Sequence, residues 1–119
     1  MSARLTSAMF VSALLRRVEA EGGFGAVIAR GFDSAGAIHV EWRHRGEVGL
    51  LSPAPFTMEP AGGWPADGME GERRFTPAPA ATEAAIAERI ASERRFDPEA
   101  WHVEIEGVDP ADVLSVVSE

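Results

Sequence analysis

Two stretches of the chain place a polar residue capable of chemistry at every second position. These residues are His39, Glu41 and Arg43 in the first stretch and His102, Glu104 and Glu106 in the second. A period of two is the period of a β-strand, so each set should project from one face of its strand. Two imidazoles and a carboxylate can ligate a divalent metal, and an imidazole beside a carboxylate can act as a general base.

If the two strands are neighbours, the sequence predicts one polar cluster on the sheet face, containing His39, Glu41, His102 and Glu104. The alternative is an ordinary solvated strand face. No spacing among these residues is diagnostic of a metal site, and we assign neither a metal ligand nor a catalytic residue.

Arg95 and Trp64 are two further candidates for binding. Arg95 belongs to the run Arg94-Arg95-Phe96-Asp97, and its planar guanidinium suits a carboxylate or a phosphate. The competing interpretation is a cation that stabilises the C-terminus of a helix. Trp64 lies in a segment rich in Pro and Gly, where it could contact a ligand or fold back over the core.

The residue types that are missing exclude several kinds of site. The chain has no Cys, Lys, Tyr, Asn or Gln. It therefore lacks a thiol nucleophile, a Schiff-base lysine and a phenolic acid. No Gly-x-Ser-x-Gly motif surrounds a serine, and Gly22-Gly23-Phe24-Gly25 follows an expected helix rather than a strand, so it predicts a helix end and not a phosphate loop. We expect no cofactor.

Charge and hydropathy limit the possible partners. The net charge is −8, and residues 51–119 hold five Arg against fourteen acidic residues. Such an acidic surface repels nucleic-acid backbones, so we expect no nucleic-acid partner. No stretch of about 20 apolar residues is present, so we expect no membrane span.

Hydrophobic periodicity predicts one domain over residues 1–119. Helices are expected over residues 8–20 and 82–95, and a short one from residue 110 through 117. Strands are expected at residues 24–32, 38–43, 48–51, 73–76 and 101–106. Residues 52–71 contain four Pro and four Gly and predict a long loop.

This order predicts a two-layer α+β fold. The sheet should be mostly antiparallel, because short turns join consecutive strands. We expect both long helices to pack on the same apolar face of the sheet, the one that carries Val40, Trp42, Trp101 and Val103.

Three segments resemble domain-of-unknown-function family 1491. They are Leu14-Leu15-Arg16-Arg17, Gly36-Ala37 and Arg95-Phe96-Asp97-Pro98-x-x-Trp101-x-Val103-Glu104-Ile105-Glu106. The last is the most specific, and the resemblance covers most of the chain outside residues 52–71. It implies a small protein of a bacterial cytoplasm, mainly alphaproteobacterial, and it implies no activity, cofactor or catalytic residue.

We therefore expect a small, non-enzymatic binding or interaction module that forms a homodimer. The core is short of large apolar residues, and a small sheet has edges that must be paired, covered or charged. The loop at residues 52–71 also carries aromatic and Met residues suited to an interface. The alternative is a small metal-binding protein or enzyme that uses the His/carboxylate cluster.

Overall fold

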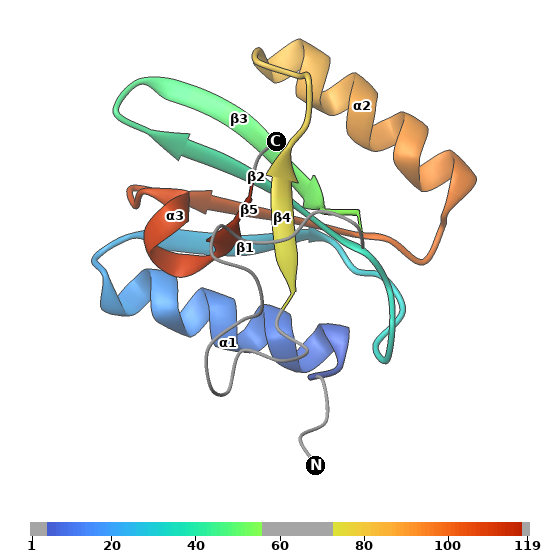
Figure 1. Ribbon diagram of the computed structural model, residues 1–119, viewed down its shortest axis with the longest axis horizontal. Coiled ribbons are helices and arrows are strands. Elements are labelled where there is room, and N and C mark those ends of the chain that lie inside the picture. Colours follow the sequence, from blue (N-terminus) through green and yellow to red (C-terminus); the bar gives the residue numbers. More distant parts are fainter. Residues whose placement is uncertain (1–4, 56–72, 118–119) are drawn as a thin grey trace.

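The computed structural model describes residues 5–55 and 73–117, and Figure 1 shows the arrangement of their elements. In chain order the elements are α1 (Ser7–Ala20), β1 (Phe24–Ala29), β2 (Ile38–His44), β3 (Glu47–Pro53), β4 (Arg74–Pro77), α2 (Glu83–Phe96), β5 (Trp101–Glu106), α3 (Pro110–Val113) and β6 (Ser115–Val116). No helix in the described part of the chain is long and apolar enough to cross a membrane.

Local signals explain where the two long helices begin and end. The Thr6 hydroxyl accepts the Met9 N–H at the start of α1, and the Thr82 hydroxyl accepts the Ala85 N–H at the start of α2. Such N-caps satisfy backbone donors that a first helical turn leaves unpaired. Gly22 follows α1 with a φ of 89°, a left-handed conformation that glycine adopts without strain. Both predicted helices are thus confirmed.

The sheet has six strands in the order β1-β5-β2-β3-β4-β6. The strand β5 lies between β1 and β2, antiparallel to β1 and parallel to β2. The β2–β3 and β3–β4 pairs are antiparallel, and β4–β6 is parallel. The mostly antiparallel sheet is therefore confirmed, and so is the α+β class, with three helices packed against the sheet.

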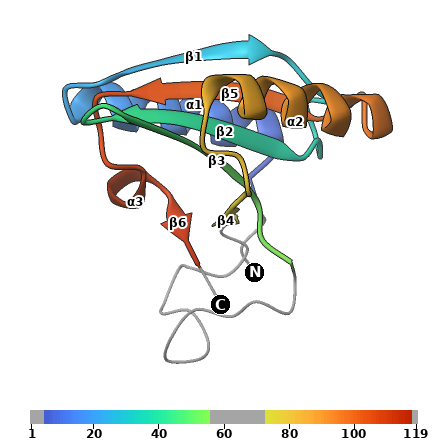
Figure 2. The same cartoon turned by 90° about the horizontal axis from the view of Figure 1, so that it is seen from above.

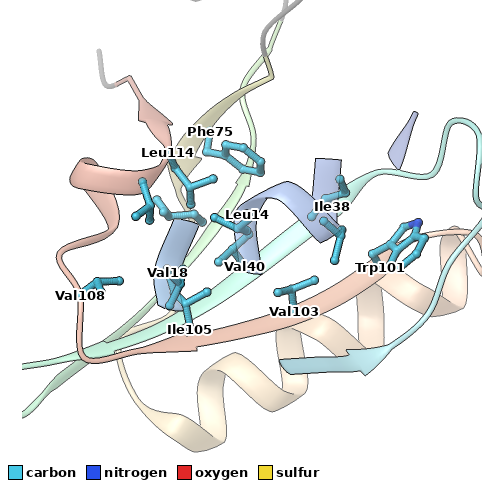
Figure 3. Packing of buried hydrophobic residues seen from close by; sticks show 13 residues of the cluster. Leu14, Val18, Ile38, Val40, Phe75, Trp101, Val103, Ile105, Val108 and Leu114 are labelled. Atoms are coloured by element: carbon cyan, nitrogen blue, oxygen red, sulfur yellow. The ribbon is translucent and has the colours of Figure 1, made fainter. Parts of the chain in front are cut away.

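The main core lies between α1, α3 and one face of the sheet, as Figure 3 shows. Leu14 and Val18 of α1 pack on Val40 of β2 and Val103 of β5. Trp101 is buried in the same cluster, as the alternation of residues 101–106 predicts, whereas Trp42 is only half buried.

The position of α2 differs from the sequence expectation. Figure 2 shows α1 and α2 on opposite sides of the sheet. Ile86 and Ile90 of α2 pack on Leu50, while the adjacent Leu51 belongs to the main core. Successive residues of a strand point to opposite faces, so β3 is covered on both faces. Periodicity shows that α2 has an apolar stripe, but it does not tell which face of the sheet receives that stripe.

The C-terminal segment also differs from its prediction. The expected helix to residue 117 is only the single turn α3, which begins after the cap Asp109 and is followed by β6. Pairing of Ser115–Val116 with β4 replaces the helical hydrogen bonds there. In the predicted loop, Ser52 and Pro53 complete β3, and Trp64 lies outside the described residues.

Candidate functional site

The structure brings four of the predicted site residues together. In the parallel β2–β5 pair, His39 lies opposite His102 and Glu41 lies opposite Glu104. Opposite residues in a ladder share a face of the sheet, so the condition for the predicted cluster is met. This face is the one that α2 covers, because Leu50 lies opposite Glu41 in the β2–β3 pair.

Arg43 holds the carboxylates of this cluster in an ion-pair network. Its guanidinium nitrogens lie 3.3 Å from Glu41 Oε2, 3.1 Å from Glu104 Oε2 and 3.0 Å from Glu83 Oε2. The hydrogen bonds with Glu83 and Glu104 raise the pKa of Arg43, and the hydrogen bond from Arg43 lowers the pKa of the Glu83 carboxyl. Because Glu83 belongs to α2, the network ties the first turn of this helix to the sheet.

The two histidines are fixed by different partners. His102 Nε2 lies 3.0 Å from Glu41 Oε1, and since an ionised carboxylate only accepts hydrogen bonds, the nitrogen donates. His39 Nδ1 lies 2.9 Å from Ser52 Oγ.

Burial sets the charge state of His39. Only 6% of His39 is exposed, and this burial lowers the pKa of its imidazole below the usual 6.5. The neighbouring His102 and Arg89 lower the pKa further, while the carboxylates of Glu93 and Asp97 oppose the shift. The imidazole of His39 is therefore neutral at pH 7.

The cluster acts as an internal polar layer between sheet and helix. Glu41 is 8% exposed, and both of its oxygens are engaged, by His102 and by Arg43. Within residues 5–55 and 73–117, no group of three or more His, Asp or Glu side chains is arranged to hold a metal ion. The buried members of the cluster are hydrogen-bonded, and Arg43 links the cluster to α2 through Glu83.

Arg95 is not part of this cluster but lies at an open groove of about 450 Å³ beside it, between α2 and the sheet. The groove is lined by Ala29, Ala87, Ile90, Ala91, Arg94, Arg95 and His102. Two of the predicted binding residues, Arg95 and His102, thus meet at one surface. Sequence reasoning missed the groove itself, although the short side chains of Ala87 and Ala91 were a signal that the helix leaves space beside it.

A second surface that sequence reasoning missed is the free edge formed by β1. Figure 2 shows β1 along the outer edge of the sheet, with no described element beyond it. Among the exposed large apolar residues of the described chain, four lie in β1 or just after it: Phe24, Val27, Ile28 and Phe32. The signal was present in the sequence, since residues 24–29 carry no charge.

Comparison with known proteins supports the fold and gives no activity. The family profile described as "Protein of unknown function (DUF1491)" matches residues 5–115. The chain is similar to the solution structure of protein Atu0922 from A. tumefaciens, at 43% identity over 98% of both chains, with a TM-score of 0.79.

Two structures of a DUF1491 family protein from Caulobacter crescentus are also similar. The crystal structure is 29% identical with a TM-score of 0.75, and the NMR structure is 30% identical with a TM-score of 0.76. Each comparison covers 98% of this chain and 100% of the other. Among curated proteins, none matches the chain.

Proposed function

We propose that this chain, which belongs to the DUF1491 family of proteins of unknown function, is a non-enzymatic interaction module that forms a homodimer through β1. A bacterial cytoplasmic setting is part of the proposal, and the sources of the similar structures support its bacterial part. The carrying observation is the free, uncharged and partly apolar edge of the sheet.

An edge strand presents unpaired backbone N–H and C=O groups along its outer side, and natural proteins protect such edges with charge, Pro or irregularity. The six residues of β1 contain no charge and no Pro. Its one irregularity is a shift in register between Val27 and Ala29. Phe24 is 60% exposed and Ile28 is 53% exposed. Burying these side chains against a partner would remove apolar area from water, which favours association.

Charge favours a second copy of the same chain as the occupant of this edge. The acidic Glu21 precedes β1 and the basic Arg30 follows it. An antiparallel pair of β1 strands related by a two-fold axis brings each Glu21 end toward the partner's Arg30 end. Arg30 pairs with Asp33 within its own chain, but both side chains are exposed and such surface pairs are weak. The contact between strands remains uncharged, so the net charge of −8 is kept away from the interface centre.

The His/carboxylate cluster supports a non-enzymatic role. Its carboxylates are engaged by Arg43 and His102, and α2 covers it. These residues hold the helix on the sheet, and the sheet in turn presents β1.

Sedimentation equilibrium over a concentration series tests the proposal. The wild-type chain should move from its monomer mass of 12.7 kDa toward twice that mass as concentration rises. Ile28→Lys adds an edge charge of the kind that prevents strand pairing, and it should remain at 12.7 kDa.

Met9→Lys is the matched control, because Met9 is 55% exposed but lies on α1. It should associate like the wild type. A wild-type chain that stays monomeric at high micromolar concentration, or a dimer that Ile28→Lys leaves unchanged, would contradict the proposal.

A further inference from the structure

The groove beside α2 differs in charge from the rest of the molecule. The chain carries a net charge of −8, yet the residues that line the groove include two arginines and a histidine and no acidic residue. Its volume of about 450 Å³ lies within the range of small-molecule sites. The remaining lining residues, three Ala and one Ile, are apolar.

We propose that this groove binds a small amphiphilic carboxylate, with its apolar chain along the helix and its carboxylate at Arg95. The site is separate from the β1 interface, so the proposal does not depend on dimer formation.

The two arginines have different roles. The Arg94 guanidinium donates to the Ala100 carbonyl at 3.1 Å and approaches the Pro98 carbonyl at 3.5 Å. These bonds hold Arg94 at the end of α2. Arg95 is exposed and makes no hydrogen bond or ion pair with any described residue. Its planar set of donors is therefore available, and that geometry matches the two oxygens of a carboxylate.

The apolar part of the groove argues for a ligand with a hydrocarbon chain. Ala87 and Ala91 are one turn apart on α2, and their short side chains line the groove together with Ile90 and Ala29. Ile90 is buried in the small cluster with Leu50, so this part of the lining is held in place. A bare anion would leave this surface in water, whereas an alkyl chain would cover it and gain from its burial.

His102 connects the groove to the polar layer beneath it. Its Nε2 donates to Glu41, so the imidazole is held in one orientation while the residue lines the groove. A ligand that contacts His102 therefore meets a side chain that is already ordered, which reduces the entropy cost of binding.

Titration of the 15N-labelled protein with sodium octanoate, followed by amide chemical shifts, tests the site. Saturable shifts should appear in residues 87–95 and at His102. Acetate carries the charge without the chain, and 1-octanol carries the chain without the charge. Each should bind at least about tenfold more weakly than octanoate, because each lacks one of the two contributions.

Two variants locate the carboxylate and the chain. Arg95→Gln should weaken octanoate binding about tenfold, because it removes a charge-assisted hydrogen bond to the carboxylate. Ala91→Leu fills the groove with a residue of good helix propensity, and it should abolish binding while far-UV helix content is kept.

The matched controls are Arg16→Gln on α1 and Ala84→Leu on an exposed position of α2 outside the groove. Both should bind octanoate like the wild type. Absence of saturable shifts at millimolar octanoate, equal binding of 1-octanol, or unchanged affinity in Arg95→Gln would overturn the proposal. If Ala91→Leu fails to fold, the result for Arg95→Gln and the comparison of octanoate with acetate and 1-octanol still test the proposal.

Discussion

At the scale of single residues, Trp101 illustrates how a strand residue stabilises both core and loop. Its ring is buried in the main core, and its Nε1 donates to the Phe32 carbonyl at 3.0 Å. The Arg30 guanidinium lies over the ring, 4.9 Å from its centre. The segment after β1 is thereby fixed to the first residue of β5.

Trp101→Ala should therefore lower the free energy of unfolding by about 3–5 kcal/mol, the usual cost of removing a large buried aromatic side chain. Chemical denaturation at equilibrium measures this loss. Trp101→Phe, which keeps a ring but not the indole N–H, should lose less. A loss under about 1 kcal/mol for the alanine variant, typical of surface sites, would contradict the buried position.

A second residue-scale prediction concerns His39 and pH. Burial lowers the pKa of His39 in the folded state below 6.5, while the unfolded chain keeps the usual value. As pH falls below 6.5, the unfolded state takes up the proton first, so stability decreases. The stability that depends on neutral His39 is fully present above pH 6.5. It is lost as the pH falls through the lower pKa that His39 has in the folded state.

Denaturation midpoints at pH 8 and pH 5 measure this effect. His39→Gln should flatten the decrease toward acidic pH. Ser52→Ala is the control, because it removes the partner of Nδ1 but keeps the buried imidazole, and the decrease should persist. An imidazole of His39 that titrates at or above 6.5 by NMR would refute the account of this residue.

The sequence predicts some of these residue properties and not others. Alternation in residues 38–43 and 101–106 places His39, Glu41, His102 and Glu104 on one face, because side-chain direction follows from strand period alone. Their burial depends on a helix about 40 residues away from β2 in the chain, and no local pattern encodes that contact.

At the scale of elements, α2 rests on few contacts. Its apolar attachment is the cluster of Leu50, Ile86 and Ile90. Its polar attachments are the ion pair of Glu83 with Arg43 and the hydrogen bond from Arg94 to the Ala100 carbonyl. An element held by a small cluster opens at lower free energy than the rest of the molecule.

Ile86→Ala should cost about 2–5 kcal/mol, since Ile86 is fully buried and the change leaves a cavity. Hydrogen exchange should accelerate in α2 more than in α1. Ala85→Ser, at the preceding exposed position, should leave exchange in α2 nearly unchanged. Equal acceleration throughout both helices would show that α2 does not open independently.

Element boundaries were predictable where a cap or a glycine marks them, as at Thr6, Thr82 and Gly22. The order of the strands in the sheet was not predictable. The strand β5 lies between β1 and β2, and it pairs with β1 although more than 70 residues separate the two strands in the chain. For the same reason the sequence did not reveal that β1 is an edge strand. The free edge and the groove at Arg95 both follow from this arrangement. The uncharged residues 24–29 and the short side chains of Ala87 and Ala91 therefore indicate these surfaces only once the strand order is known.

At the scale of the whole molecule, the structure separates three regions by chemistry. The core under α1 supplies most apolar burial, the layer under α2 contains the satisfied polar cluster, and the edge at β1 exposes apolar side chains. In the monomer, the apolar side chains at the β1 edge remain in contact with water, which costs free energy. A second copy of the chain would cover them.

The most direct test is an isotope-filtered NOE spectrum of a mixed sample, in which one half of the chains is 13C,15N-labelled and the other half is unlabelled. Contacts between labelled and unlabelled chains report only on the interface. We expect inter-chain contacts within residues 24–29, with Phe24 of one copy near the far end of the partner's strand, and we expect Ile28→Lys to lose them. Inter-chain contacts that lie elsewhere on the molecule, or none at concentrations where the chain is fully folded, would contradict it.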